Sequence, residues 1–351
     1  MNIAIFIRSL SKGGAEKQAI LLTEYLSQFY QTYLIVYCKT TFDNHAVSPN
    51  LNIIYLEGNL FNKVFSLYKF FRAHKITHLF NYLPVNNVFG IIIGKLAGVK
   101  YMYGGIRGTK YKGRIKMILN KFLCNYFSTG FISNSYAAEE SYSKYGLKKN
   151  KILVIHNAIK KISAKRCLHS NLIVLSVGRF TEQKDYFTAI DAISLLEVNY
   201  PQVKGKFLYK IIGYGKLKNE ILEYIVAENL QDIIELRTDG KIGDSYNTSD
   251  ILLNTSVHEG MPNVVMEAMN NGLPIIGTDS GDTKYLISDS KNGYLCPVRN
   301  SSYISGKLKE LILNDSLRLK MGNWSKKIID ENFRPNKVYK VYVELIENNE
   351  K

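Results

Sequence analysis

Short apolar runs of strand length alternate along this chain with longer stretches whose apolar residues recur at helical spacing. In the first half, the strand-like runs are residues 3–7, 33–37, 53–56, 77–83, 101–103, 130–133 and 152–155. The helical stretches between them are residues 15–29, 61–74, 88–96, 113–127 and 137–145. Strands that alternate with helices favour a parallel sheet with helices on both of its faces.

The alternation is interrupted at residues 158–170, which are polar, basic and without regular periodicity, and which we interpret as an interdomain linker. It then restarts. Strands are expected at 172–177, 207–212, 233–236, 251–254 and 274–278, and helices at 186–196, 216–230 and 263–270, with a mostly helical segment at 308–349. The sequence therefore predicts an α/β fold of two Rossmann-like domains, whose parallel sheets face an interdomain cleft.

The length of the chain agrees with two domains. Its 351 residues, 46% of them hydrophobic, are more than a single core usually organises. We therefore expect a first domain of residues 1–160, a second of residues 161–335, and a C-terminal helix of residues 336–351 that packs back toward the first domain. Ligands of open parallel sheets bind beyond the carboxyl ends of the strands, so the residues that follow strands are the ones to inspect.

Positive charge is concentrated in the first half of the chain. The formal net charge is +16, and residues 1–170 hold 24 Lys and Arg against 6 Asp and Glu, while the remainder holds 22 against 24. Such an imbalance favours an anionic partner, which could be a nucleic acid, an anionic membrane surface or a phosphorylated substrate. The alternative is a lysine-rich surface that only keeps the protein soluble.

The cysteine spacing and the hydropathy of the chain bear on the cellular compartment in which we expect the protein. The four cysteines are widely separated and have no zinc-binding spacing, and no Asp-x-Asp pair follows a strand, so we predict no metal site. Reduced cysteine in apolar runs fits a reducing cytoplasm. The chain has no signal-peptide pattern and no uninterrupted run of about 18 apolar residues, so we expect a cytoplasmic protein whose membrane contact, if any, is peripheral.

The most specific segment is residues 257–269, VHEGMPNVVMEAM, which follows an expected strand and opens a helix at Pro262 or Asn263. Proline is favourable in a first helical turn, and the N–H groups of a helix N-terminus attract phosphate or a developing oxyanion. Glu259 and Glu267 flank this helix start. Carboxylates accept hydrogen bonds from sugar hydroxyls and do not hold phosphate, which suggests a ligand with both groups. A capped helix with ordinary surface glutamates is the alternative.

Two further loops carry residues suited to a diphosphate. Gly13 and Gly14 follow the first strand, and without side chains they allow backbone amides to approach phosphate closely, although many such loops are only tight turns. Arg179 and Lys184 follow the strand at 172–177, and their cations would neutralise a leaving diphosphate. A surface salt bridge is the alternative for this pair.

Together these segments resemble the retaining glycosyltransferases of family 4, which have the GT-B fold. Residues 259–267 match the E-G-x-P-x-x-x-x-E signature of that family. Residues 11–16, SKGGAE, resemble its GGAE loop, residues 177–184, VGRFTEQK, its V-G-R-l-x-x-x-K segment, and residues 213–215, GYG, its G-x-G turn. The resemblance covers nearly the whole chain, and it is strong in residues 171–299 and looser in residues 1–157.

The resemblance implies an acceptor-side first domain and a second domain that binds a UDP- or GDP-sugar, with no cofactor and no metal. It implies three catalytic residues, Arg179, Lys184 and Glu259, with Glu259 in contact with the transferred sugar and Glu267 on the ribose hydroxyls. The expected donor-binding residues are Gly13, Gly14, Gly178, Gly213, Gly215, Gly260, Met261, Pro262, Asn263, Val264 and Glu267. Retention is also implied: the leaving diphosphate accepts the proton of the acceptor while the acceptor attacks the same face of the sugar.

The acceptor side departs from the family. Many relatives carry a histidine near the end of a strand in the first domain, whereas residues 79–83 here, LFNYL, contain none. His78 stands at the start of that strand, and we interpret it as structural. Asn81 lies in this strand, and Arg107 follows the next strand. We expect these two residues to face the acceptor instead.

A basic amphipathic helix is expected from about residue 113. Its surroundings combine cations with apolar side chains: Lys110, Lys112, Arg114, Lys116, Lys121, Tyr111, Ile115, Met117, Ile118, Phe122 and Leu123. Such a surface binds anionic lipid, with about 1 kcal/mol from each cation near the membrane. This predicts a saccharide acceptor on polyprenyl diphosphate at the inner face of a bacterial membrane, in the assembly of lipopolysaccharide O-antigen, capsule or a similar polysaccharide. A helix with its apolar side in the core is the alternative.

Three other functions compete with a glycosyltransferase. A nucleic-acid-binding protein would explain the charge, but the sequence has no recognisable nucleic-acid-binding motif, and we expect no nucleic-acid partner. A dinucleotide-dependent oxidoreductase needs a G-x-G-x-x-G turn that residues 11–16 do not provide. A relative that has kept only the nucleotide-binding fold would not need Arg179, Lys184, Glu259 and Glu267 together.

Overall fold

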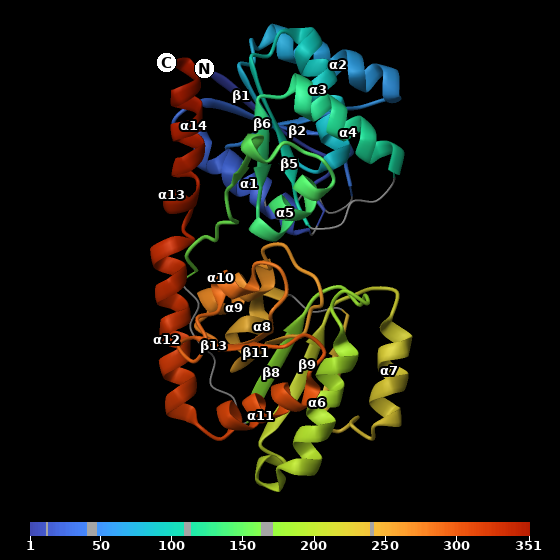
Figure 1. Cartoon of the computed structure of the whole chain (residues 1–351), viewed down its shortest axis with the longest axis vertical. Helices are drawn as coiled ribbons and strands as arrows, with labels where there is room; N and C mark the ends of the chain where they lie inside the picture. The colour runs from blue at the N-terminus through green and yellow to red at the C-terminus, as the bar shows by residue number, and fades with distance from the viewer. Residues whose placement is uncertain (12, 41–47, 109–113, 163–170, 239–241) are drawn as a thin grey trace. The chain divides into compact units, whose positions relative to one another are not determined.

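The computed structural model describes residues 1–11, 13–40, 48–108, 114–162, 171–238 and 242–351. Lys110, Lys112 and most of the predicted linker lie outside these residues. The chain forms two compact units, each described here by itself (Figure 1). Unit 1 comprises Met1–Ala158 and Phe333–Lys351, and unit 2 comprises Ile159–Asn332. Among the described residues, no helix has an apolar stretch long enough to cross a bilayer.

Unit 1 is built on a seven-stranded parallel sheet with the order β3-β2-β1-β4-β5-β6-β7. Its strands are β1 (Asn2–Ile7), β2 (Gln31–Val36), β3 (Asn52–Tyr55), β4 (His78–Asn81), β5 (Tyr101–Ile106), β6 (Gly130–Ser133) and β7 (Ile152–Val154). Its helices are α1 (Gly14–Leu26), α2 (Leu60–Ala73), α3 (Pro84–Ala97), α4 (Arg114–Phe127), α5 (Tyr136–Lys144), α13 (Pro335–Val338) and α14 (Lys340–Glu350).

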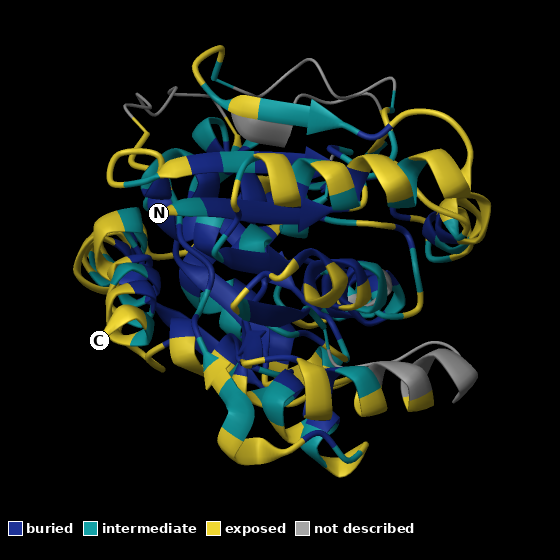
Figure 2. Ribbon diagram, turned by 90° about the horizontal axis from the view of Figure 1, so that it is seen from above, coloured by how far each residue is buried: buried dark blue, intermediate teal, exposed yellow. Residues whose placement is uncertain are grey.

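Alternation along the strands explains why the sheet of unit 1 is covered on both faces. Ile3, Ile5 and Ile7 pack with side chains of α1 and of the C-terminal segment, while Ala4 and Phe6 pack with side chains of α2 and α3. Successive side chains of a strand point to opposite faces, so a fully apolar strand requires helices on both sides. Figure 2 shows the buried strands in dark blue between helices whose outer sides are exposed.

The C-terminal segment belongs to unit 1 through a buried hydrogen-bond network. The side chain of Gln18 accepts from the Ala158 N–H at 2.8 Å and donates to the Ala158 carbonyl at 2.8 Å. The Tyr339 hydroxyl donates to the same Gln18 oxygen at 2.7 Å. Tyr339 and Tyr342 are buried in the core of the unit. Gln18 therefore connects α1 to Ala158, where the chain leaves unit 1, and to the C-terminal segment, where the chain returns to unit 1.

His78, at the start of β4, is fully buried and stacks on Tyr101 at 4.7 Å between ring centroids. Burial lowers its pKa to about 4, an effect that Glu350 opposes and Lys100 reinforces. In the unfolded chain the ring takes up a proton near its ordinary pKa of 6.5. Between these two values the unfolded state binds more protons, so the contribution of His78 to stability is complete above pH 6.5 and is lost as the pH falls toward 4.

We therefore expect His78→Phe, which preserves the stacking and removes the titration, to flatten the pH dependence of stability. The measurement is the melting temperature of both proteins at intervals from pH 7 to pH 4. The wild-type protein should lose more stability than the variant between pH 6.5 and pH 4. Equal losses would show that the imidazole is not buried in its neutral form.

Unit 2 is built on a six-stranded parallel sheet with the order β10-β9-β8-β11-β12-β13. Its strands are β8 (Leu172–Val177), β9 (Phe207–Ile212), β10 (Ile234–Arg237), β11 (Ile251–Asn254), β12 (Ile275–Thr278) and β13 (Gly293–Cys296). Its helices are α6 (Tyr186–Asn199), α7 (Lys218–Ala227), α8 (Ile242–Asn247), α9 (Asn263–Asn270), α10 (Thr283–Leu286), α11 (Ser301–Ile312) and α12 (Asp315–Asn332).

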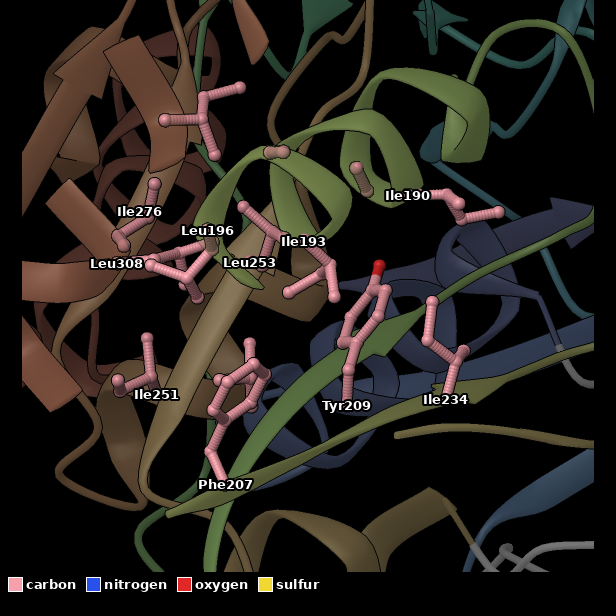
Figure 3. Close-up of a cluster of buried hydrophobic side chains, with 14 of the residues drawn as sticks. Ile190, Ile193, Leu196, Phe207, Tyr209, Ile234, Ile251, Leu253, Ile276 and Leu308 are labelled. Carbon is pink, nitrogen blue, oxygen red and sulfur yellow. The ribbon is translucent and has the colours of Figure 1, made fainter. Parts of the chain in front are cut away.

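One face of this sheet forms the core of unit 2 with α6 and α11. Ile193 and Leu196 of α6 and Leu308 of α11 pack over Tyr209 and Leu253 of the sheet (Figure 3). This cluster holds β8, β9 and β11 in fixed register, and so it fixes the loops that follow these strands. The two predicted parallel sheets are confirmed, whereas β13 and the short helix α8 were not predicted.

Candidate active site

The strand order of unit 2 reverses its direction between β8 and β11. From β8 the chain proceeds to β9 on one side, and β11 lies against β8 on the other side. The helices that follow β8 and β11 therefore leave in opposite directions, which makes the carboxyl ends of these two strands the expected ligand site. The loops that border it are residues 178–185 and residues 255–262.

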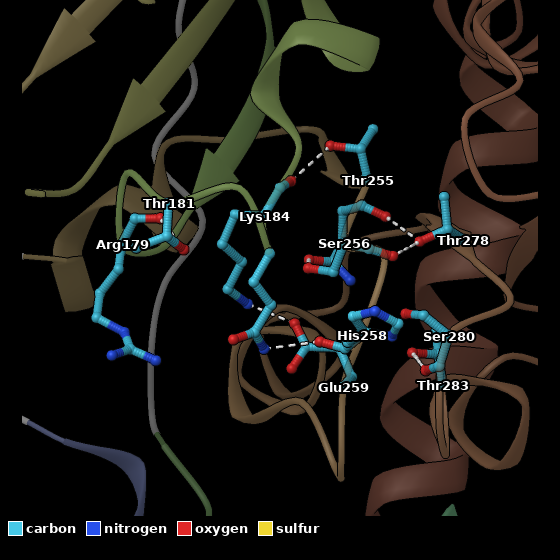
Figure 4. A network of polar contacts seen from close by, with 12 residues as sticks. Arg179, Thr181, Lys184, Thr255, Ser256, His258, Glu259, Thr278, Ser280 and Thr283 are labelled. Atoms are coloured by element: carbon cyan, nitrogen blue, oxygen red, sulfur yellow. Dashed lines mark hydrogen bonds and ion pairs between the residues drawn. The ribbon is translucent and has the colours of Figure 1, made fainter. Parts of the chain in front are cut away.

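Hydrogen bonds fasten these two loops to each other. The Thr255 hydroxyl lies 3.0 Å from the Lys184 carbonyl and 2.9 Å from the Asp185 carbonyl, to which it donates. The Gln183 amide donates to the His258 carbonyl at 2.7 Å. In the opposite direction, the Val257 N–H donates to the Gln183 carbonyl at 2.9 Å. The two loops thus form one rigid platform, which Figure 4 shows at close range.

The centre of this platform is an ion pair between Lys184 and Glu259. The Lys184 ammonium lies 2.5 Å from Glu259 Oε1, and the two side chains are only 14% and 9% exposed. Figure 4 shows both side chains turned toward each other from their loops. An enclosed charge needs a partner, so each residue fixes the other in place. Two residues that the sequence assigned to catalysis are thus brought together.

Arg179 is placed differently. Its side chain is exposed and extends away from the Lys184–Glu259 pair in Figure 4. Within the part of the chain that the structure describes, its guanidinium makes no ion pair. On the next residue of the same loop, the Phe180 N–H donates to the Tyr214 carbonyl at 2.8 Å. The guanidinium is therefore available to an anionic ligand, and its catalytic role stays a prediction.

The glycines after β8 and β9 allow two loops to touch. A Cβ on Gly213 would lie 1.8 Å from the Gly178 carbonyl oxygen, and one on Gly215 would lie 2.5 Å from the Phe180 carbonyl oxygen. The Gly178 N–H donates to Ile212 and the Gly213 N–H to Arg237, each at 3.0 Å. The N–H groups of Gly178 and Gly213 are thus engaged inside the protein, and these residues shape the platform by their lack of side chains.

The helix predicted to open near Pro262 is α9, which begins at Asn263 with Pro262 as its N-cap. Met261 and Pro262 are buried, and Asn263 and Val264 are half-buried. The Gly260 carbonyl accepts from the Asp282 N–H at 3.0 Å, which holds the loop before the helix.

Glu267 lies one turn into α9 and is half-buried. Its Oε2 accepts a hydrogen bond of 2.8 Å from the hydroxyl of Tyr246 in α8. Tyr246 was not predicted as a site residue. The signal for it is weak, because α8 has only six residues and no marked periodicity.

Gly281 was also not predicted. Its φ is +60°, and a Cβ there would lie 2.0 Å from the Glu259 carbonyl oxygen. The turn after β12 therefore packs directly on the backbone of Glu259, which only glycine permits.

The predicted residues of unit 1 lie at the carboxyl ends of its own strands. Gly13 is the N-cap of α1, and Gly14 is the first residue of that helix. A Cβ on Gly13 would lie 2.1 Å from Glu16 Oε2, and the Ser11 hydroxyl donates to Glu16 Oε1 at 3.0 Å. The Glu16 carboxylate thus folds over the glycine loop, and the role of Gly13 and Gly14 toward a donor stays a prediction.

Asn81 and Arg107 have partners within unit 1. Asn81 is buried and donates to the Tyr103 carbonyl at 3.1 Å, which links β4 to β5. Arg107 donates to Asn157 Oδ1 at 3.1 Å and lies 4.4 Å from the centre of the Tyr82 ring. These contacts stabilise the unit, and the acceptor contacts of both residues stay predictions.

Within the described residues, no three His, Cys, Asp or Glu side chains lie close enough together to hold a metal ion.

Comparison with known sequences finds one matching family. Residues 159–328 match the glycosyl transferases group 1 family. The amylovoran biosynthesis glycosyltransferase AmsK of Erwinia amylovora is 28% identical over 53% of this chain and 47% of its own length. An uncharacterized glycosyltransferase of Methanocaldococcus jannaschii is 30% identical over 56% of this chain and 55% of its own. This chain thus spans about half the length of these curated relatives.

A third relative matches over nearly its full length. It is the N-acetylgalactosamine-N,N'-diacetylbacillosaminyl-diphospho-undecaprenol 4-alpha-N-acetylgalactosaminyltransferase of Campylobacter jejuni, 26% identical over 93% of this chain and 94% of that protein.

Among solved structures, HepE of Anabaena in complex with UDP-glucose superimposes with a TM-score of 0.85 and 16% identity, over 99% of this chain and 100% of that one. TarM has a TM-score of 0.79 and 13% identity, over 98% of each chain. At this identity the likeness concerns the fold, and it confirms the predicted α/β, GT-B class. The cleft between the two units stays a prediction.

Proposed function

We propose, from the match of residues 159–328 to the glycosyl transferases group 1 family, that this chain is a retaining glycosyltransferase. Its donor is a UDP- or GDP-sugar, and its acceptor is a saccharide of a bacterial surface polysaccharide, such as lipopolysaccharide O-antigen or capsule. The observation that carries the proposal is the Lys184–Glu259 ion pair, which stands where the strand order of unit 2 reverses.

The ion pair is suited to a sugar linked to diphosphate. Glu259 holds the Lys184 ammonium in place, so the positive charge is already positioned when the negative charge of the leaving group develops. The second oxygen of the Glu259 carboxylate is left to accept a hydrogen bond from a hydroxyl of the transferred sugar. Arg179, exposed on the same loop, adds a second cation for the diphosphate.

The reaction needs no protein nucleophile. The acceptor hydroxyl oxygen forms a bond to the anomeric carbon while the bond from that carbon to the diphosphate oxygen breaks. The proton of the acceptor hydroxyl passes to the departing diphosphate oxygen, and attack on the same face retains the configuration. The protein contributes by placing the donor and by stabilising the charge of the diphosphate.

An experiment on the purified protein tests this function. Thermal shift with a panel of UDP- and GDP-sugars identifies the donor, and release of the nucleoside diphosphate in the presence of a polyprenyl-diphosphate-linked saccharide measures transfer. We expect one nucleotide to raise the melting temperature and to be turned over. Binding of DNA or RNA at low salt without any response to nucleotide sugars would favour a nucleic-acid-binding protein instead, and nucleotide binding without turnover a non-catalytic relative.

The outer side of α4 favours an acceptor held at a membrane. Ile118, Phe122 and Tyr126 are 56%, 55% and 66% exposed, and their spacing of four residues places them in one row along the helix. Cations border this row, since Lys121 is exposed and the Lys148 ammonium lies 5.4 Å from the centre of the Tyr126 ring. Exposed aromatic residues with adjacent lysines are typical of surfaces that rest on anionic lipid.

We therefore expect the protein to co-sediment with vesicles that contain phosphatidylglycerol, at low salt, and much less with vesicles of phosphatidylcholine alone. Replacement of Phe122 and Tyr126 by serine should reduce the bound fraction several-fold, because it removes apolar area and leaves the charge unchanged. Replacement of Val198 and Leu319, exposed apolar residues of unit 2, by serine is the matched control. Equal fractions of protein bound to neutral and anionic vesicles would contradict the proposed contact with an anionic membrane.

A further inference from the structure

A buried hydroxyl lies beside the Lys184–Glu259 pair. Tyr186, the first residue of α6, is 3% exposed, and its hydroxyl has no hydrogen-bond partner among the described residues. Its ring is fixed, because it packs edge-on against Phe180 with 5.5 Å between the ring centroids. A buried hydroxyl that makes no hydrogen bond lowers the stability of a protein, so its presence requires an explanation.

The Tyr186 hydroxyl lies over the same glycine as the Lys184 side chain. A Cβ on Gly178 would be 3.1 Å from the Tyr186 hydroxyl and 3.0 Å from Lys184 Cε. The absence of a side chain at Gly178 thus leaves room for the hydroxyl and the lysine together. From Cε the lysine continues to its ammonium, which lies 2.5 Å from Glu259 Oε1. The hydroxyl is therefore an immediate neighbour of the ion pair.

The Tyr186 phenol can act only as a donor toward this pair. Burial raises its pKa well above the ordinary value, and nearby Tyr209 and the Glu259 carboxylate raise it further. The phenol therefore keeps its proton throughout the physiological pH range. The Lys184 ammonium has only protons to offer, whereas a carboxylate has only acceptor oxygens. Of the two charged groups, Glu259 is thus the one to which the phenol can donate.

The proposed reaction creates a need for such a donor. Lys184 pairs with Glu259 in the free protein, and in the proposed donor complex it also faces the diphosphate. As negative charge grows on the leaving diphosphate, the ammonium is drawn toward it and holds Glu259 less firmly. An enclosed carboxylate that loses part of its cation needs another hydrogen bond to stay in place. Tyr186 is a buried donor at this position.

We infer that Tyr186 is a positioning residue for Glu259: its hydroxyl donates to the carboxylate when Lys184 is shared with the diphosphate, and so keeps Glu259 on the transferred sugar. This inference rests on the proposed function, because it requires a ligand that draws Lys184 away from Glu259. The hydroxyl then lowers the stability of the free protein and contributes only in the donor complex, as is common for groups placed for activity.

Urea unfolding tests this role without any substrate. Tyr186→Phe should leave the unfolding midpoint unchanged or raise it, because no hydrogen bond is lost. In Lys184→Met the Glu259 carboxylate has no cation and turns to the Tyr186 hydroxyl, so in that background Tyr186→Phe should increase the equilibrium constant of unfolding about tenfold. Tyr209→Phe is the matched control. It removes a buried hydroxyl that does have a partner, Ser176 at 2.8 Å, and should lower stability equally in both backgrounds.

Turnover and nucleotide binding test the role toward the sugar. In Tyr186→Phe we expect kcat for transfer to fall about tenfold, because Glu259 is held less firmly during the reaction. The dissociation constants of UDP and GDP, measured by calorimetry, should change by less than about twofold, since these ligands carry no sugar for Glu259 to contact. Tyr209→Phe should transfer the sugar at the wild-type rate.

The outcomes separate the inference from the proposed function. Equal effects of Tyr186→Phe on stability in the wild-type and Lys184→Met backgrounds, or an unchanged kcat, would overturn the positioning role and leave the transferase proposal intact. A loss of affinity for UDP or GDP as large as the loss in kcat would also overturn it, because Tyr186 would then act on the diphosphate. A wild-type protein that turns over no nucleotide sugar would overturn the proposed function itself, whereas the unfolding comparison would still decide whether Tyr186 can donate to Glu259.

Discussion

Replacement of Glu267 by alanine is expected to lower kcat/KM for the nucleotide sugar by about a hundredfold or more. Two losses add together. The donor loses a carboxylate acceptor for its ribose hydroxyls, and the hydroxyl of Tyr246 is left buried without its partner. The measurement is the initial rate of nucleoside diphosphate release as a function of donor concentration.

Two further variants separate the loss of donor binding from the loss of protein stability. Glu223→Ala removes an exposed glutamate from α7 and should leave both kcat/KM and the melting temperature unchanged. In Glu267→Ala/Tyr246→Phe the unpaired hydroxyl is gone, so the melting temperature should recover relative to Glu267→Ala while the rate stays low. Turnover by Glu267→Ala at the wild-type rate would contradict the role of this carboxylate in donor binding.

The second large effect is expected from Lys184→Met. It leaves the Glu259 carboxylate enclosed without a cation, which costs about 3 kcal/mol of stability, and it removes the charge beside the leaving diphosphate, which costs about a hundredfold or more in transfer rate. Urea denaturation followed by the fluorescence of Trp324 measures the first loss. Trp324 is the only tryptophan of the chain and lies in α12, so its signal reports on unit 2.

The double variant Lys184→Met/Glu259→Gln separates the two losses, because it removes both charges. We expect most of the stability to return and the activity to stay lost. Lys216→Met is the control: Lys216 pairs with Glu182 at 3.2 Å, but these side chains are 67% and 83% exposed, so stability should change by less than about 0.5 kcal/mol. A stable Lys184→Met with wild-type turnover would contradict both the enclosure of the pair and its place in the reaction.

The sequence predicted most strands and helices but not how the strands pair. Apolar runs such as Leu172–Val177 and Ile251–Asn254 predict strands with correct bounds, because strands buried on both faces are continuous in hydrophobicity. Nothing in those runs specifies that β8 and β11 are neighbours. The contact of Lys184 with Glu259, 75 residues apart, depends on that neighbourhood and becomes visible only in the sheet.

The features that the sequence did not predict lie in segments without a recognisable sequence pattern. Tyr246 lies on a helix too short for periodicity to reveal, and β13 is a four-residue strand that contains Gly293 and Cys296. Asn81 is a residue whose role the sequence leaves undecided. The structure buries its side chain against β5, where the amide nitrogen donates to the Tyr103 carbonyl while Oδ1 has no hydrogen-bond partner among the described residues, and its expected acceptor contact stays a prediction. A polar residue at a strand end does not by itself tell the two situations apart.

The network around Gln18 has a consequence for the order of assembly during synthesis. Tyr339 and Tyr342 fill the core of unit 1 beside α1, yet the ribosome makes them after the whole of unit 2. Unit 2 is one continuous stretch of chain and can complete its fold as soon as it emerges. Unit 1, although translated first, keeps an open apolar groove until its final helices arrive, so it is the later of the two to mature.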